Sequence, residues 1–195
     1  MQGFGFKLPE MSKYNIKWLK DQLTKGATLK FLYFWGHIPK PKQRMGNWCF
    51  SQWYESPFEV EGVKYRTAEH WMMAHKASLF EDREIHDRII DSKTSGEAKE
   101  LGRFVTGFDD DIWIAKRYEI VVAGNRHKFT QNKEIGEYLM NTKQRVLVEA
   151  SPVDTIWGVG MAKDNQNIND VDSWRGLNLL GFALMETRDL LLHKF

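Results

Sequence analysis

The segment from Tyr65 to Ala77 contains a carboxylate and an ammonium group at a spacing suited to chemistry. Thr67 is a good N-cap for a helix. This places Glu69 in the first turn, where a carboxylate complements the helix dipole and lies near free backbone N–H groups. Lys76 falls on the same face by the three-and-four spacing, among methionine and aromatic residues. The pair is either an ion pair of the core or part of a site, and the spacing leaves both interpretations open.

A second carboxylate, Asp154, lies in a turn between Pro152 and Trp157. Glycoside cleavage uses two carboxylates that flank a sugar carbon, one handling protons and one facing the developing positive charge. By spacing alone, however, Asp154 is better explained as a turn or capping residue. Trp113 and Trp157 would suit a substrate with a flat leaving group and a sugar, although each ring alone is more often part of a core.

Lys76 itself has two interpretations. A lysine partly removed from water on an apolar helix can lose its proton and attack an anomeric carbon, which gives a Schiff base with the opened sugar. In the simpler interpretation, the Lys76 ammonium only pairs with Glu69.

Other catalytic designs find little support in the sequence. His70 and His75 are five residues apart, so they do not share a helix face, and we expect no metal site. Gly158-Val159-Gly160 lacks the third glycine and the lysine–serine pair of a phosphate loop. Ser51 and Ser151 lie in no nucleophile-elbow pattern.

The chain has 195 residues, a net charge of +2 and eight tryptophans. This length predicts one domain that buries a sizeable core without disulfides or metals. The charge is too small to indicate a nucleic-acid-binding surface by itself. The lone Cys49 excludes an internal disulfide and a cysteine-rich metal site. No signal-peptide pattern or bilayer-spanning apolar run of ~20 residues occurs, so we expect a soluble cytoplasmic protein without membrane contact.

Hydrophobic periodicity predicts a mainly α, α+β domain, compact and multihelical, with a few short strands and one hairpin. Strands are expected at 31–35, within 48–65, where Glu61-Gly62 suits a two-residue hairpin turn, and at 146–148. Helices are expected at 12–25 with Ser12 as a cap, from Thr67 through 77, at 82–90, at 94–102 behind a Thr94 capping box, at 112–129, at 132–140 with Asn132 as a cap, and at 178–192. Residues 162–172 are polar and predict a loop or lid. The basic segment 37–46 is interpreted as a solvated connection in preference to a phosphate contact.

Several separated segments occur in an order that is more specific than any one of them. They are Phe50-Ser51-Gln52-Trp53 to Pro57-Phe58; Tyr65-Arg66-Thr67-Ala68-Glu69-His70 through Ala74-His75-Lys76-Ala77; Trp113; Val148-Glu149 through Asp154 to Trp157-Gly158; and Gly176-Leu177-Asn178-Leu179-Leu180-Gly181 with Leu184-Met185-Glu186-Thr187-Arg188. Together they resemble the NADAR family, the YbiA-like N-glycosidases, over about residues 31–193. We therefore expect residues 1–30 to be an N-terminal extension with a short amphipathic helix, and residues 31–195 to form the family domain.

The resemblance implies a mostly helical domain that hydrolyses N-glycosidic bonds to ribose phosphates without a cofactor. Two substrate groups are associated with such proteins: ribosylaminopyrimidine phosphates of early riboflavin biosynthesis, and ADP-ribose attached to guanine, including guanine in nucleic acid. The resemblance assigns catalysis to Glu69 and Asp154, with Lys76 as a covalent participant, and substrate contacts to Trp113 and Trp157. Further candidates for substrate contacts are Arg103, Arg117, Lys128, Asn178 and Ser51.

Three hypotheses for function follow. The first is an N-glycosidase acting on one or both of these ribosylated bases. The second is a non-catalytic module that binds ADP-ribose or a related nucleotide in the same cleft. The third is a nucleic-acid-binding protein whose basic loop, 37–44, holds phosphates, against which the near-neutral charge argues. The sequence does not indicate an oligomeric state.

Overall fold

The chain folds into seven helices and four short strands within residues 12–193, the part that the computed structural model describes. The helices are α1 (Ile16–Thr24), α2 (Ala68–Leu79), α3 (Arg83–Asp91), α4 (Ser95–Leu101), α5 (Asp110–Gln131), α6 (Lys133–Met140) and α7 (Leu179–Leu192). The strands are β1 (Phe31–Phe34), β2 (Phe58–Val60), β3 (Val63–Tyr65) and β4 (Val146–Glu149), and two short 3-10 helices are η1 (Asn47–Phe50) and η2 (Val171–Ser173). The prediction of a mainly helical α+β domain is confirmed.

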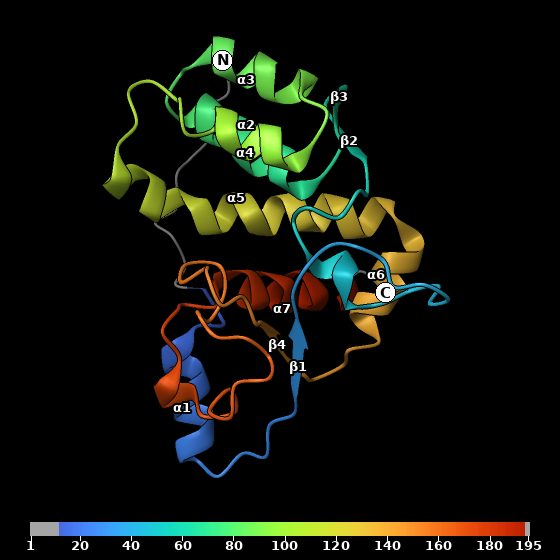
Figure 1. Cartoon of the computed structure of the whole chain (residues 1–195), viewed down its shortest axis with the longest axis vertical. Coiled ribbons are helices and arrows are strands. Elements are labelled where there is room, and N and C mark those ends of the chain that lie inside the picture. The colour runs from blue at the N-terminus through green and yellow to red at the C-terminus, as the bar shows by residue number, and fades with distance from the viewer. Residues whose placement is uncertain (1–11, 194–195) are drawn as a thin grey trace.

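The long helix α5 crosses the middle of the molecule (Figure 1). It packs against α2 and β2 on one side and against α7 on the other, while α3 and α4 pack against α2. The contact with α2 is close at Gly124, where an added Cβ would lie 2.3 Å from the Trp71 ring. Because Trp71 also donates its indole N–H to Ile120 O at 2.8 Å, the ring is fixed and only glycine fits opposite it.

Strands β1 and β4 pair in parallel, with Phe34 opposite Glu149 at the end of the register. The first three residues of β4 are buried, which fits its unbroken apolar sequence. Asn178, just before α7, donates its side-chain amide to Leu147 O at 2.9 Å and accepts from Glu149 N at 3.0 Å. These bonds attach the start of α7 to the end of β4.

Several local predictions are confirmed. Residues Glu61 and Gly62 connect β2 and β3 as an antiparallel two-residue hairpin, both with positive φ. Thr67 occupies the N-cap of α2 and accepts a hydrogen bond from His70 N. Thr94 forms the full capping box with Glu97 at the start of α4. Each of these features depends on a few adjacent residues, which is why the sequence reveals it.

Other local predictions were wrong. Asn15, not Ser12, caps α1, because its side chain accepts from Trp18 N at 2.8 Å. The segment after Gly46 forms η1 and a turn and does not begin a strand. A short buried apolar run has no periodicity that distinguishes a strand from a short helix. Asn132 does occupy the N-cap position of α6, as expected, but its side chain makes no cap bond and donates to Pro57 O and Lys128 O.

The polar segment 162–172 is a loop up to η2, as expected. It packs through the buried Ile168, whose carbonyl accepts from the Trp174 indole at 2.8 Å. Helix α1 packs on the core through the fully buried Leu19, and Tyr14 beside it donates to Asp189 of α7 at 2.8 Å. Residues 1–11 of the expected N-terminal extension lie outside the described residues.

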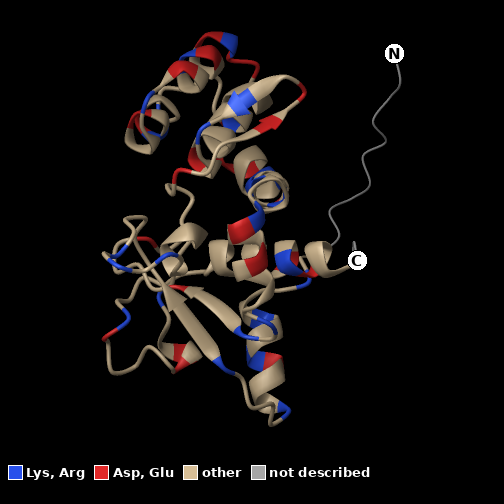
Figure 2. Ribbon diagram, turned by 90° about the vertical axis from the view of Figure 1, so that its right-hand side faces the viewer, with Lys and Arg blue, Asp and Glu red and all other residues tan. Residues whose placement is uncertain are grey.

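Charged side chains are interspersed over the molecule. Figure 2 shows Lys and Arg mixed with Asp and Glu in both halves of the ribbon, in keeping with the net charge of +2. Within residues 12–193, none of the helices has both the length and the apolar content to span a bilayer.

Candidate active site

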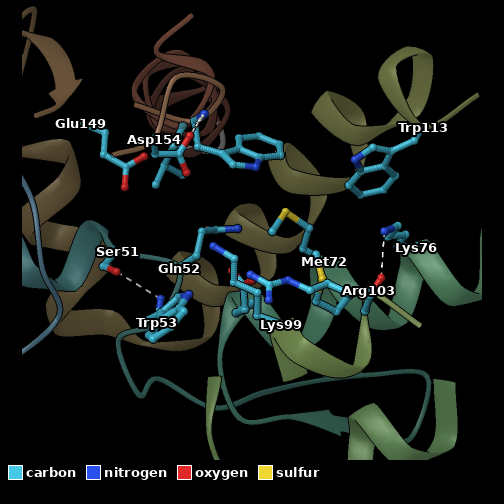
Figure 3. A pocket seen from close by; sticks show the side chains of 15 residues that line it. Ser51, Gln52, Trp53, Met72, Lys76, Lys99, Arg103, Trp113, Glu149 and Asp154 are labelled. Carbon is cyan, nitrogen blue, oxygen red and sulfur yellow. Dashed lines mark hydrogen bonds between the residues drawn. The ribbon is translucent and has the colours of Figure 1, made fainter. Parts of the chain in front are cut away.

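A pocket of about 220 Å³ lies where α2, α4, the start of α5 and the segment after β4 meet (Figure 3). Its lining residues are Ser51, Gln52 and Trp53; Glu69, Met72, Met73 and Lys76; Lys99, Gly102, Arg103 and Trp113; and Glu149, Asp154, Trp157 and Leu180. The structure therefore brings together seven of the ten residues that the sequence singled out, from segments about a hundred residues apart.

Glu69 is held in the first turn of α2. Its backbone N–H donates to Gln52 O at 3.0 Å, which attaches the turn after η1 to the start of the helix. Its side chain is buried, and among the described residues Oε1 has no hydrogen-bond partner. Burial raises the pKa of Glu69 to about 7, while Lys99 and a hydrogen bond from Trp53 oppose this effect and the charge of Asp154 adds to it. Glu69 is thus poised to exchange a proton near neutral pH.

Glu149 supplies a second buried carboxyl group at the end of β4. Its Oε2 finds no hydrogen-bond partner within the described part of the chain. Burial raises the pKa of Glu149 to about 8, and the charges of Asp154 and Glu69 raise it further, whereas Lys99 lowers it. Two carboxyl groups that repel each other in one pocket share protons, so at neutral pH one tends to be protonated and one ionised.

The position of Asp154 is compatible with both interpretations considered for it. Its Oδ1 accepts from Ile156 N at 2.8 Å and from Trp157 N at 2.7 Å, so it does stabilise a turn. The same turn places Asp154 and Trp157 in the pocket wall, opposite Gln52 and Lys99 (Figure 3). The capping explanation therefore does not remove this residue from the site.

Lys76 lies across the pocket from Glu149 and Asp154 (Figure 3). Its Nζ donates to Gly102 O at 2.8 Å and lies 4.0 Å from the centre of the Phe108 ring and 5.9 Å from that of Trp113. Among the ion pairs of residues 12–193 there is none between Lys76 and Glu69, so the simple pairing is absent. Burial lowers the pKa of Lys76, with Asp110 opposing the shift, which favours the neutral amine.

Three sequence candidates lie outside the pocket lining. Lys128 is fully buried and donates to Ser51 O at 2.8 Å behind the wall. Burial lowers its pKa to about 7. Asn178 is used entirely in the bonds to β4 described above. Arg117 is half-buried on α5, and burial lowers its pKa, against the charges of Asp110 and Asp154.

Sequence reasoning assigned no role to several residues that line the pocket: Trp53, Met72, Lys99 and Glu149. Glu149 did carry a signal, because a carboxylate directly after a buried apolar strand lies at the carboxyl end of that strand, where sites form. Lys99 carried none, since an exposed lysine on a short helix normally indicates only a solvated face. Trp53 belongs to the segment Phe50-Ser51-Gln52-Trp53 that carries part of the family resemblance, but its spacing did not indicate what its side chain faces.

The arrangement can transfer protons to and from a ligand and stack planar groups. Two buried carboxyl groups with raised pKa values provide an acid and a base, and indole rings from Trp113 and Trp157 provide flat apolar surfaces. Arg103 and Lys99 add positive charge at the edge of the pocket. No three His, Cys, Asp or Glu side chains within residues 12–193 are grouped so that they could hold a metal ion.

Comparison with known proteins agrees with the family resemblance of the sequence motifs. A family model described as NADAR domain matches residues 33–192. The chain is 39% identical over 168 residues to the protein named N-glycosidase R617 of Acanthamoeba polyphaga mimivirus, covering 83% of this chain and 96% of that protein. It is 31% identical over 133 residues to the Zea mays protein named Riboflavin biosynthesis protein PYRR, chloroplastic, covering 65% of this chain and 20% of that protein.

The fold also matches a solved structure. The NMR structure of the E. coli protein YbiA superposes with a TM-score of 0.68 at 24% identity, covering 86% of this chain and 89% of that chain. The described residues therefore adopt the same fold as that protein.

Proposed function

This chain belongs to the NADAR family, and we propose that it hydrolyses the N-glycosidic bond between a ribose phosphate and a nitrogen base. Family membership and the names of its relatives make it a hydrolase of N-glycosyl bonds. The observation that carries the proposal is the pair of buried carboxyl groups, Glu69 and Glu149, facing one small pocket beside tryptophan rings.

The two carboxyl groups divide the chemistry in our proposal. Near pH 7.5 Glu69, with a pKa of about 7, is mainly ionised, and Glu149, with a pKa of about 8, is mainly protonated. Glu149 protonates the nitrogen of the leaving base, and Glu69 removes a proton from the water that attacks C1. The carboxylate of Asp154 faces the positive charge that develops on the sugar, and the base stacks on Trp157 or Trp113.

Arg103 and Lys76 lie on the other side of the pocket and suit the phosphate of such a substrate. Lys76 has an alternative role in a covalent route. Its neutral amine attacks C1, the base leaves with a proton, and water then hydrolyses the Schiff base of the opened sugar. The lowered pKa of Lys76 supports this route, while its bond to Gly102 O and its position opposite Glu149 and Asp154 favour direct hydrolysis.

We propose a ribosylaminopyrimidine phosphate as the first substrate to test. A pocket of about 220 Å³ lies below the roughly 300–1,000 Å³ of drug-sized sites, so it suits a ribose with a single-ring base. ADP-ribosylated guanine is the second candidate, because Trp53 also borders a neighbouring cavity of about 780 Å³ that contains Arg66 and Lys93. That cavity has room and positive charge for the remainder of an ADP-ribosyl group.

The test measures, by chromatography, the release of free base from each substrate. We expect wild type to release base from at least one of them, and Glu69→Gln to lose about 10²–10⁴-fold in kcat because a general base is removed. The matched control is Glu59→Gln, which changes an exposed glutamate on β2 and should retain wild-type activity. Unchanged release by Glu69→Gln rules out the assigned role, and no release from either substrate rules out both substrates.

Two further measurements separate the alternatives. Borohydride treatment during turnover traps an adduct on Lys76 only in the covalent route. Calorimetry with ADP-ribose identifies a non-catalytic binding module if binding is tight and no base is released.

A further inference from the structure

The side chain of Gln52 lines the pocket while almost fully buried, at 6% exposed. Its Oε1 accepts a hydrogen bond from Asn125 Nδ2 at 3.1 Å. Its Nε2 is buried too, and within the described residues it has no hydrogen-bond partner. A buried N–H donor without an acceptor is unfavourable, so a native protein that retains one beside a pocket usually has a use for it.

The orientation of the Gln52 amide follows from its neighbours. Asn125 Nδ2 donates at the same time to Val121 O at 2.9 Å, inside α5. A backbone carbonyl can only accept, so the nitrogen end of Asn125 must face both Val121 O and Gln52. Gln52 must then turn its Oε1 towards Asn125, so its Nε2 points away from Asn125.

The backbone around Gln52 is fixed as well. Gln52 O accepts from Glu69 N at 3.0 Å, and Ser51 O accepts from the buried Lys128 at 2.8 Å. Two helices therefore hold this turn, α2 through Glu69 and α5 through Lys128. The side-chain N–H of Gln52, on Nε2, is therefore held in position before a ligand binds, which reduces the entropy lost on binding.

The surroundings of Gln52 indicate what it would bind. Figure 3 shows its side chain between Glu149 and Asp154 on one side and Lys99 on the other. The Asp154 carboxylate disfavours a phosphate here, and Arg103 and Lys76 across the pocket suit the phosphate better, so we assign an uncharged oxygen as the acceptor. The ring carbonyl of a base and a ribose hydroxyl both have this chemistry.

We propose that Gln52 determines substrate specificity by donating one hydrogen bond from Nε2 to an uncharged oxygen of the bound substrate. The inference rests on the proposed function for the identity of the substrate. The site then accepts ligands with an oxygen at this position and rejects those with hydrogen or an amino group there. Hydrogen would leave the buried N–H of Gln52 without an acceptor, and an amino group would place a second donor against it.

A double-mutant cycle between protein and ligand tests this proposal. The protein variants are wild type, Gln52→Met, which keeps length but removes the donor, and Gln166→Met as an exposed control. The substrates are the ribosylaminopyrimidine phosphate, its analogue lacking the ring carbonyl oxygen, and its 2-deoxy and 3-deoxy sugar analogues. The readout is kcat/KM for each combination.

We expect wild type to lose about tenfold or more on one of the three deletions, and Gln52→Met to show no further loss on that same analogue. The deletion affected identifies the oxygen as that of the base or that of the sugar. The proposal is overturned if wild type and Gln52→Met respond to every deletion by the same factor.

A binding arm keeps the test independent of turnover. Calorimetry compares the free aminopyrimidinone with the aminopyrimidine that lacks its carbonyl oxygen, and ribose 5-phosphate with its deoxy forms, on wild type and Gln52→Met. If wild type releases no base, the proposed function fails. In that case an oxygen-dependent affinity that Gln52→Met lacks still supports the role of Gln52, and equal affinities reject it.

Discussion

The pH dependence of turnover tests the division of roles between Glu69 and Glu149 most directly. Turnover requires Glu69 ionised and Glu149 protonated. With pKa values of about 7 and about 8, Glu69 becomes protonated on the acid side of pH 7.5 and Glu149 loses its proton on the alkaline side. Because these pKa values are those of the ligand-free protein, we expect a bell-shaped profile of kcat/KM with its maximum near pH 7.5.

The size of the effect follows from the two pKa values. The active protonation state makes up about 60% of the protein at pH 7.5 and about 3% at pH 5.5 and at pH 9.5, since each limb changes about tenfold per pH unit. The rate should thus fall about 20-fold two units from the optimum on either side. Ordinary carboxyl groups titrate near pH 4 and would leave the rate flat across this range.

The assay is base release at substrate concentrations well below KM from pH 5.5 to 9.5, which gives kcat/KM, with circular dichroism recorded at each pH to confirm that the protein stays folded. Glu149→Gln should remove the alkaline limb and Glu69→Gln the acid limb, each from a lower maximum rate. A flat wild-type profile, or an alkaline limb that persists in Glu149→Gln, would refute the assignment of acid and base.

Three further predictions concern stability, each measured by urea unfolding. The pKa of Lys128 is about 7 in the folded chain against an ordinary 10.5, so the unfolded chain binds more protons between these values and wild-type stability rises with pH. The stability of Lys128→Met relative to wild type should therefore fall by about 3 kcal/mol from pH 7 to 9.5; a constant difference would contradict a neutral buried lysine. Asp154→Ala should lose about 1–2 kcal/mol because two N–H bonds to Oδ1 disappear, whereas Asp154→Asn keeps that oxygen and should stay within about 0.5 kcal/mol. Gly124→Ala should cost about 1–3 kcal/mol, since its Cβ would meet the fixed ring of Trp71; wild-type stability would show that α5 can move away.

Much of the local structure was readable from the sequence. The Thr67 and Thr94 caps, the Glu61-Gly62 hairpin and the helix that carries Glu69 depend on residues within a few positions of one another. At the start of α1 the expected cap, Ser12, was wrong, because the side chain of Asn15 is the one that reaches a free N–H of the first turn.

Within the candidate site, the sequence determined which residues of α2 share a face, because helical spacing fixes that, and the ordered motifs indicated the family. Only the tertiary structure placed Glu149 and Lys99 beside Glu69, since they come from elements far apart in the chain. It also showed two side-chain positions that the sequence left open: Lys76 bonds Gly102 and not Glu69, and Lys128 bonds Ser51 O outside the pocket lining. The physical reason is that burial and charge proximity set the pKa values and roles of these groups, and both quantities exist only once the separate elements have packed together.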